Sequence, residues 1–173
     1  MSEATGSSPA SVPTLYDWLG GIDALVRLTT HFCSTVVPTD AILAPVFAGM
    51  SPNHATHVAY FLAEVLGGPP RYSSDVAGAR GGHAHMVAHH LNRLLTEQQR
   101  SRWLQQLLVS ADAVGFPSDP EFRSAFVAYL EWGSRIAVLN SAPGVPDAAP
   151  QPMPKWGWGV PGGPYQPPAE TAS

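Results

Sequence analysis

Apolar residues recur at intervals of three and four positions along most of the chain, which is the spacing of one face of an α-helix. Leu25, Leu28, Phe32 and Val36 follow this spacing in the first long stretch, and Pro38 is expected to end that helix. No alternation of apolar and polar positions, the mark of a half-buried strand, competes with it. The sequence therefore predicts an all-α protein of about five main helices.

Three further helices carry recognisable start signals. Ser51 followed by Pro52 predicts the start of one, and Gly67 is expected to end it. The stretches 96–99 (TEQQ) and 118–121 (SDPE) are capping boxes, which predict two more helix starts. The expected inward-facing residues are His54, Val58, Phe61 and Val65 in the first of these helices, Trp103, Leu107, Ala111 and Val114 in the second, and Phe122, Phe126, Leu130 and Gly133 in the third.

The two ends of the chain differ in composition from the middle. Residues 1–13 are rich in Ser, Pro and Ala and are predicted to be disordered. Residues 142–173 hold nine of the eighteen prolines, so no regular helix or central strand is expected there. The predicted globular domain is 14–141. Trp156 and Trp158 would expose a large apolar surface in an undocked tail. We therefore expect them to dock on the globular domain or on a partner.

Composition and charge narrow the classes of function. Hydrophobic residues make up 45% of the chain and charged residues 13%, the net charge is −4, and Lys and Arg form no run. Nucleic acid is therefore not an expected partner, because phosphate binding needs a basic stripe. No stretch approaches the roughly 20 apolar residues of a membrane span. The single cysteine and a start without a secretory signal predict a cytoplasmic protein.

The segment GGHAHMVAHHLNRLL, residues 81–95, contains four of the seven histidines. On a helix over 83–95, His90 lies beside the apolar side, whereas His89 points away together with His85 and Arg93. His83 is expected in the glycine-rich entry, so the four histidines are not expected to converge. The apolar side itself is formed by Met86, Val87, Leu91 and Leu94.

Three interpretations of these histidines remain open. His90 is a buried histidine bonded to a carbonyl, or His85 and His89, one turn apart, share a metal ion in a non-haem helical module. The second lacks an Asp, Glu or Cys in the segment to complete a ligand set. In the third, His54 and His57 on another helix face the same apolar slot, which suits haem, a planar apolar group whose iron is reached by imidazole from one or both sides.

The chain resembles the truncated haemoglobins, and group II of that family most closely, from about Leu15 to Leu139. The resemblance rests on LYDWLGG, HFC in the first long helix, APVF ending at Phe47, FLAEVLGGPPRY, and HHLNRLLTEQQRSRW, in which Trp103 follows His90 by thirteen residues. It implies an abbreviated globin, a two-over-two helical sandwich, with haem b as the cofactor.

The resemblance also implies roles for individual residues. His90 matches the proximal iron ligand, and Met86 lies one turn before it. His57 matches a position that holds a haem propionate in many relatives and ligates the iron in some. Cys33 stands where relatives of this group usually have tyrosine, so a distal phenol is missing. The other matches are Phe47 against the haem face, His54 at the distal position, Val58 on the next turn, Phe61 in the pocket wall, and Trp103 with its indole N–H toward the bound ligand.

The implied function is binding of O₂, NO or CO at the haem iron, for oxygen binding and transport or for removal of NO. NO dioxygenation or a peroxidase-like activity would need an external reductase, because the chain has no flavin or nicotinamide motif. A redox or gas sensor with two histidines on the iron is an alternative, besides the non-haem module. The oligomeric state is expected to be a monomer or a homodimer.

Overall fold

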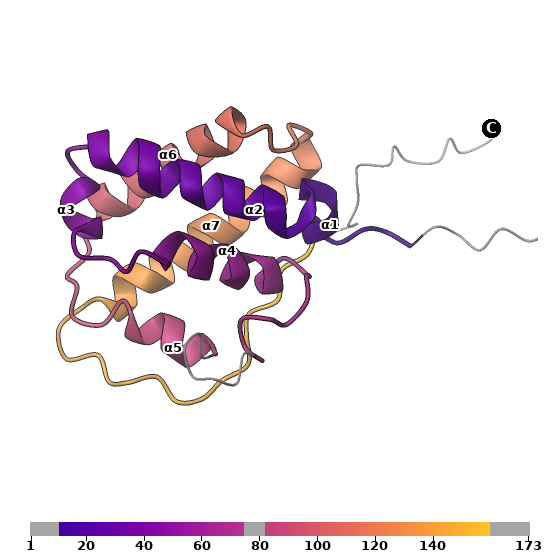
Figure 1. Cartoon of the computed structure of the whole chain (residues 1–173). Helices are drawn as coiled ribbons and strands as arrows, with labels where there is room; N and C mark the ends of the chain where they lie inside the picture. Colours follow the sequence, from indigo (N-terminus) through magenta and orange to yellow (C-terminus); the bar gives the residue numbers. More distant parts are fainter. Residues whose placement is uncertain (1–10, 75–81, 160–173) are drawn as a thin grey trace, which may run out of the picture.

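The computed structural model describes residues 11–74 and 82–159, and every regular element in these ranges is helical (Figure 1). The predicted all-α class is therefore confirmed. The α-helices are α1 (Leu15–Leu19), α2 (Gly21–His31), α3 (Ala44–Phe47), α4 (His54–Val65), α5 (His83–Ala88), α6 (Glu97–Ala113) and α7 (Pro120–Asn140), and two short elements, η1 (Phe32–Val36) and η2 (Val37–Thr39), follow α2. None of the helices in the described part of the chain is long and apolar enough to cross a membrane.

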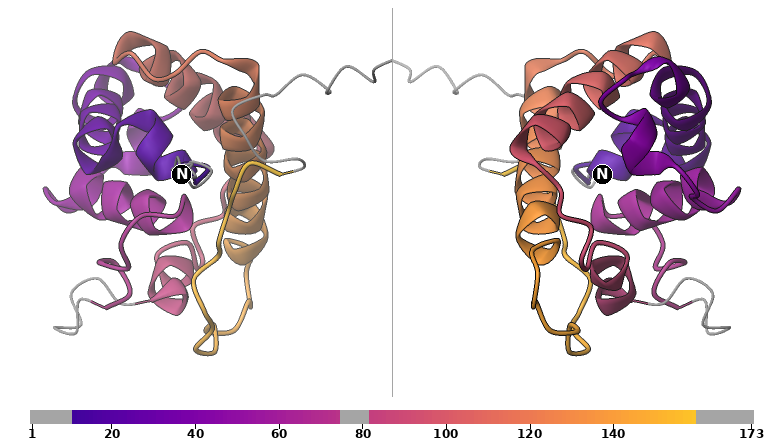
Figure 2. Two further views of the ribbon diagram at one scale, coloured as in Figure 1. Left: turned by 90° about the vertical axis from the view of Figure 1, so that its right-hand side faces the viewer. Right: turned by 90° about the vertical axis from the view of Figure 1, so that its left-hand side faces the viewer.

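The long helices form two pairs, α2 with α4 and α6 with α7, which face each other across the core (Figure 2). This arrangement is the predicted two-over-two sandwich. The faces predicted from the helical spacing are the buried ones: Leu25, Leu28, Phe61, Val65 and Leu107 lie in the core, and α7 adds Phe122, Phe126 and Leu130. The shorter helices of the sandwich, α2 with 11 residues and α4 with 12, owe most of their stability to this packing rather than to intrinsic helix propensity.

Several predicted helix boundaries are wrong by a few residues. The first long helix continues past His31 but as a wider π-helical turn, η1, followed by the 3₁₀ turn η2 at Pro38. The second begins at His54 with Asn53 as its N-cap, because residues 51–53 form a separate turn. The capping box at Thr96 is confirmed, since its hydroxyl accepts from the Gln99 N–H.

The last helix has Asp119, not Ser118, as its N-cap. The Asp119 carboxylate accepts from the Phe122 N–H at 2.9 Å, and Pro120 occupies the first helical position, where its missing N–H costs nothing. The predicted box was therefore displaced by one residue.

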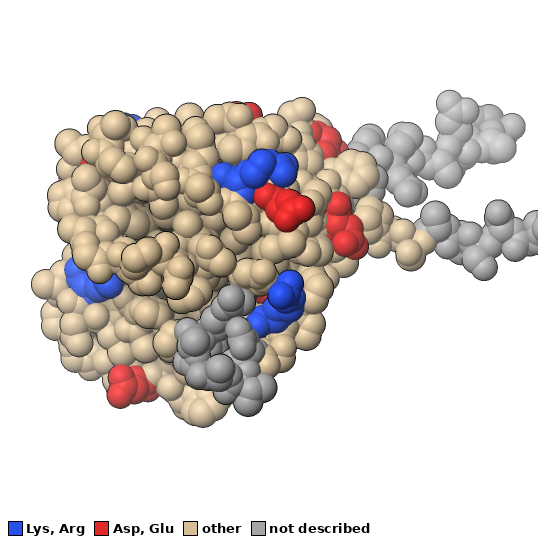
Figure 3. Space-filling view, in the orientation of Figure 1, with Lys and Arg blue, Asp and Glu red and all other residues tan. Residues whose placement is uncertain are grey.

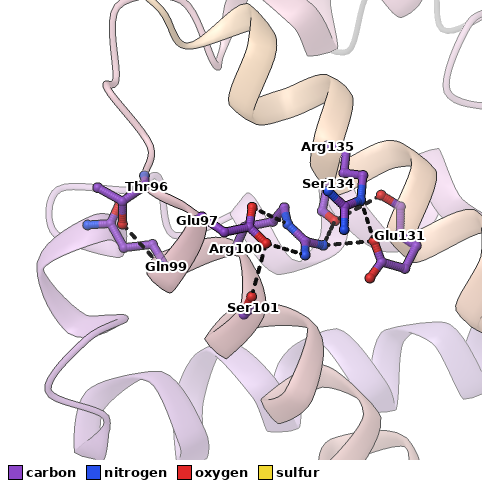
Figure 4. A network of polar contacts seen from close by, with 8 residues as sticks. All are labelled: Thr96, Glu97, Gln99, Arg100, Ser101, Glu131, Ser134 and Arg135. Carbon is purple, nitrogen blue, oxygen red and sulfur yellow. Dashed lines mark hydrogen bonds and ion pairs between the residues drawn. The ribbon is translucent and has the colours of Figure 1, made fainter.

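A buried arginine joins the start of α6 to α7 (Figure 4). The Arg100 guanidinium donates to the Glu97 carboxylate, to Glu131 at 3.0 Å and to the Ser134 hydroxyl at 3.2 Å. The hydrogen bond from Arg100 lowers the pKa of Glu97 to about 2.

On the face shown in Figure 3, charged side chains are few and of mixed sign. That face therefore offers no basic stripe for nucleic acid.

Two glycines end α4 where it meets α1. Gly67 has φ of +97°, a conformation that suits glycine. Gly68 has no room for a side chain, because a Cβ there would lie 2.7 Å from the Ala63 carbonyl oxygen and 2.8 Å from the Tyr16 ring. The predicted end of this helix is confirmed.

Gly68→Ala is expected to destabilise the protein by about 1–3 kcal/mol, the usual cost of forcing extra atoms into a packed site. The free energy of unfolding, measured by chemical denaturation, checks this. Gly157→Ala is the matched control, since a Cβ at Gly157 meets nothing within 4 Å. Equal stability of the two variants would contradict the close packing at Gly68.

The described part of the tail has no regular helix or strand, as predicted, and packs back onto the helices. Met153 is buried, and the indole N–H groups of Trp156 and Trp158 donate to the carbonyls of Ala125 and Pro13. The prediction that both tryptophans dock is confirmed, with the globular domain as the surface. Most of residues 1–13, for which disorder was predicted, lie outside the described residues. The tail after residue 159 also lies outside them.

Candidate functional site

A cavity of about 460 Å³ opens between the helix pairs and α5. This volume lies in the range of small-molecule and cofactor sites. All of the residues that the sequence singled out for a cofactor line it: Cys33, Phe47, His54, His57, Val58, Phe61, Met86, His90 and Trp103. Residues distant in the sequence thus meet at one apolar site.

His90 has one ring nitrogen fixed and the other left over. Its Nδ1 lies 2.9 Å from the Met86 carbonyl oxygen, and because a carbonyl only accepts, Nδ1 carries the hydrogen. Burial lowers the pKa of His90, so the ring is neutral at pH 7. Nε2 therefore keeps a lone pair, and a carbonyl behind the other nitrogen is the usual support of a metal-bound histidine.

The predicted helix over 83–95 is wrong in its second half. α5 ends at Ala88, and the chain then turns, with positive φ at Asn92 and Leu94. Leu94 is 60% exposed instead of facing the apolar side. The cause is tertiary: the N–H groups of Leu94 and Leu95 donate to Ser141 rather than to the preceding turn.

The histidines of this segment also lie closer together than the helix argument predicts. His83 belongs to α5 rather than to its glycine-rich entry, and it lines the cavity together with His85, His89 and His90. His89 keeps helical φ and ψ, and its N–H bonds to the His85 carbonyl. Its exposed ring lies beside His85, as predicted, although it also contributes to the cavity lining.

His85 and His89, the pair considered for a non-haem metal, do come together, with their Nε2 atoms 3.0 Å apart. In the ranges 11–74 and 82–159, however, no group of three or more His, Cys, Asp or Glu side chains is placed to hold a metal ion. A structural zinc site needs four convergent ligands. The pair therefore does not form such a centre from described residues.

His54 lies in the aromatic part of the cavity. Its ring packs edge-on against Phe47, with centroids 5.7 Å apart, and Phe47 packs in the same way against Phe32. Burial, and after it the positive charge of neighbours led by His89, lowers the pKa of His54 to about 4. The imidazole is therefore neutral at pH 7 and offers both a donor and an acceptor.

Cys33 reaches the cavity from η1, the π-helical turn after α2. Burial raises the pKa of its thiol to about 11, so it stays protonated at neutral pH. A protonated thiol is only a weak hydrogen-bond donor. Trp103 lines the cavity from α6 and carries a stronger donor, the indole N–H.

Part of the cavity wall was not predicted. Tyr129, Leu130 and Gly133 line it from α7, and Pro154 lines it from the tail. The helical spacing of apolar residues predicted which face of α7 points inward. It did not indicate which residues of that face line a cavity and which pack in the core. No local pattern indicated that a proline of the tail returns to this cavity.

Comparison with known proteins places these features among globins. The model of the family described as bacterial-like globin matches residues 14–131. The group 2 truncated haemoglobin YjbI of Bacillus subtilis is 29% identical over 118 residues, 68% of this chain and 83% of the relative. The group 1 truncated haemoglobin GlbN of Nostoc commune is 38% identical over 60 residues, which are 34% of this chain and half the length of that relative.

Solved structures show the same fold. The group II truncated haemoglobin of Bacillus anthracis superposes with a TM-score of 0.64 at 24% identity, over 75% of this chain and 93% of the other. The truncated oxygen-avid haemoglobin of Bacillus subtilis gives 0.60 at 28% identity, over 73% and 99%. The group II 2-on-2 haemoglobin of Agrobacterium tumefaciens gives 0.61 at 20% identity, over 75% and 97%.

Proposed function

We propose that this chain, which belongs to the bacterial-like globin family and shares the fold of the group II truncated haemoglobins, binds haem b in the cavity between its helix pairs. His90 is the proposed iron ligand. The proposed role of the bound haem is to take up small gas molecules. The observation that carries the proposal is the His90 ring, whose Nδ1 is held by the Met86 carbonyl while Nε2 is left with its lone pair.

The residues present suit haem in two respects. The cavity is lined mainly by apolar and aromatic side chains, as a planar apolar cofactor requires. The available ligand is a neutral imidazole with a carbonyl behind it, which fixes the tautomer and makes Nε2 the more basic nitrogen. Phe47, which packs between Phe32 and His54, supplies a flat aromatic wall.

Haem held by His90 would supply an iron that takes O₂, NO or CO. The chain's own contribution to ligand binding would be a small set of donors in an apolar cavity. Trp103 donates only, and His54, neutral at pH 7, donates or accepts. Cys33 contributes little, because its thiol stays protonated and donates weakly.

Within gas binding, we propose oxygen binding or the oxidation of NO as the role. The donors Trp103 and His54 support both, since they stabilise negative charge that develops on oxygen. NO dioxygenation or a peroxidase-like activity would draw electrons from a separate reductase, because the sequence has no flavin or nicotinamide motif. We propose a cytoplasmic monomer or homodimer.

The experiment that tests this proposal is a titration of the haem-free chain with haem, followed by absorption. We expect a Soret band that saturates at one haem per chain and shifts when CO is added to the reduced protein. A weak, non-saturating spectrum, like that of haem in detergent, would contradict the proposal. The non-haem module would instead take zinc and leave haem unbound.

A second role, a redox or gas sensor with two histidines on iron, rests on His54 and His57. Both come from α4, about one turn apart, and both line the cavity. We expect one of them to bind the ferric iron opposite His90, giving a low-spin spectrum that His54→Ala or His57→Ala makes high-spin. A five-coordinate ferrous spectrum that neither substitution changes would contradict this, and His57 would then be left to contact a haem propionate.

A further inference from the structure

The segment that carries His90 has little hydrophobic packing of its own. α5 contains six residues, and only Val87 among them is buried. His90 itself lies in the turns that follow, outside any helix. Burial of apolar surface supplies most of the stability of a helix this short, so the segment needs other anchors.

One anchor holds the segment at its downstream end. The Leu94 N–H donates to the Ser141 carbonyl at 3.0 Å, and the Leu95 N–H donates to the Ser141 hydroxyl at 2.9 Å. Ser141 is 1% exposed and stands where α7 ends and the tail begins. Both acceptors of these hydrogen bonds thus belong to a residue that is buried in the fold.

A second anchor lies before the segment, at the end of α4. Glu64, a carboxylate only 2% exposed, accepts from the N–H of Ser73 at 2.9 Å and from its hydroxyl at 2.5 Å. Ser73 is near the last residue described before α5. The Lys155 ammonium of the tail lies 3.9 Å from the same carboxylate.

The tail connects these two anchors. It leaves α7 at Ser141, passes on the side of the molecule where α5 lies, and returns to the end of α4 (Figure 1). There the Trp156 N–H donates to the Val65 carbonyl at 2.8 Å, a group of the last helical turn without a partner inside α4. The Trp156 indole N–H donates to the Ala125 carbonyl of α7 at 3.0 Å.

The Trp156 ring is also packed between aromatic residues of α7. Its centroid lies 5.6 Å from that of Tyr129 and 5.8 Å from that of Trp132. Pro154, two residues earlier, lines the cavity, and Met153 is buried. The tail is thus fixed to α4 and α7 at one point and forms part of the cavity wall beside it.

We propose that residues 141–159, which we call the C-terminal strap, position His90: Ser141 holds the chain just after it, and Trp156 fixes the other end of the strap to α4 and α7. Trp156 and Ser141 are positioning residues, since neither touches the iron. The expected effect on haem binding rests on the proposed function, in which His90 is the iron ligand. The mechanical link between the strap and residues 83–95 does not depend on that function.

The test compares three variants of the full chain. Trp156→Ala removes the ring and its hydrogen bond, Trp156→Phe keeps an aromatic ring but loses the indole donor, and Trp158→Ala is the matched control in the same strap. Trp158, two residues further on, donates to the Pro13 carbonyl and packs on Trp18 and Phe122, not on the end of α4. Its loss leaves both anchors of the His90 segment in place.

The first readout is amide hydrogen exchange of peptides within 83–95, in the haem-free and in the haem-loaded protein. Loss of one net hydrogen bond corresponds to about a fivefold change in an opening equilibrium. We expect exchange in this segment to rise about fivefold or more in Trp156→Ala, less in Trp156→Phe, and not in Trp158→Ala. A rise spread evenly over all helices of Trp156→Ala would show general destabilisation and overturn the proposal.

The second readout is the iron–imidazole stretching frequency of the reduced protein, together with the rate of haem loss to an acceptor globin. We expect the frequency to shift and haem loss to quicken about fivefold in Trp156→Ala only. An unchanged frequency and unchanged exchange in Trp156→Ala would refute the role of the strap. If the chain fails to bind haem at all, the exchange data still decide the strap, so the two failures are distinguishable.

Discussion

His90→Ala is expected to abolish stable haem binding. The substitution removes the neutral imidazole whose Nδ1 is tied to the Met86 carbonyl and whose Nε2 is left with a lone pair. Partners in the outer shell of a metal site are already worth about 10- to 100-fold in affinity, so loss of the ligand itself should raise the haem dissociation constant more than about a hundredfold. The measurement is haem affinity by absorption titration.

His89→Ala is the control for this prediction. His89 is the neighbour of His90, lines the same cavity and pairs with His85. It lacks the carbonyl support that fixes the His90 ring. We expect His89→Ala to keep haem and the Soret band of the parent protein, and equal haem loss in both variants would mean that His90 is not the ligand.

Cys33→Tyr is expected to slow the release of O₂ about tenfold. The resemblance to group II implies that tyrosine is usual at this position, and Cys33 does line the cavity. A phenol adds a hydrogen bond that the protonated thiol makes only weakly. Such a bond contributes about 1 kcal/mol, and more toward a charged acceptor, and about 1.4 kcal/mol is a factor of ten.

The release rate is measured by stopped-flow mixing of the oxygenated protein with dithionite. Cys33→Phe is the matched control, because it adds nearly the same bulk without the hydroxyl. We expect release from Cys33→Phe to stay near the rate of the parent protein. Equal rates in the tyrosine and phenylalanine variants would show that the hydroxyl does not reach the ligand and that Trp103 and His54 act alone.

The all-α class and the buried faces could be predicted because both depend on helical periodicity, whereas the two-over-two arrangement and the set of cavity residues were implied by the resemblance to truncated haemoglobins. Residues such as Phe61, Phe122 and Phe126 repeat on one face, and that face is what the two-over-two packing buries. The same spacing brought Val58 and Trp103 to one cavity. A regular helix carries this information locally, so sequence alone suffices for it.

The segment after His83 could not be predicted in the same way. Its residues fit a helix to position 95, but Ser141, some fifty positions later, draws the N–H groups of Leu94 and Leu95 away from it. Competition between local and distant hydrogen bonds is invisible in a window of the sequence. The prediction that Leu94 faces the apolar side failed for this reason, whereas His90, four residues earlier, does lie at the cavity.

The tail presents the opposite case. Over residues 142–159 its composition correctly excluded helix and strand, and the two tryptophans correctly indicated docking. Where they dock depends on open carbonyls at Val65 and Ala125, which exist only once α4 and α7 are folded. Backbone acceptors leave no trace in the side-chain pattern, so the link from the tail to the cavity became visible only in the structure.

The most direct test of the haem site is chemical rescue of His90→Gly, which leaves space for a free imidazole where the side chain stood. The variant is mixed with one equivalent of haem, and the absorption spectrum of the mixture is recorded before and after imidazole is added. We predict that imidazole restores the Soret band of the parent protein and its shift with CO. A folded His90→Gly protein that shows the parent spectrum without added imidazole would contradict the account.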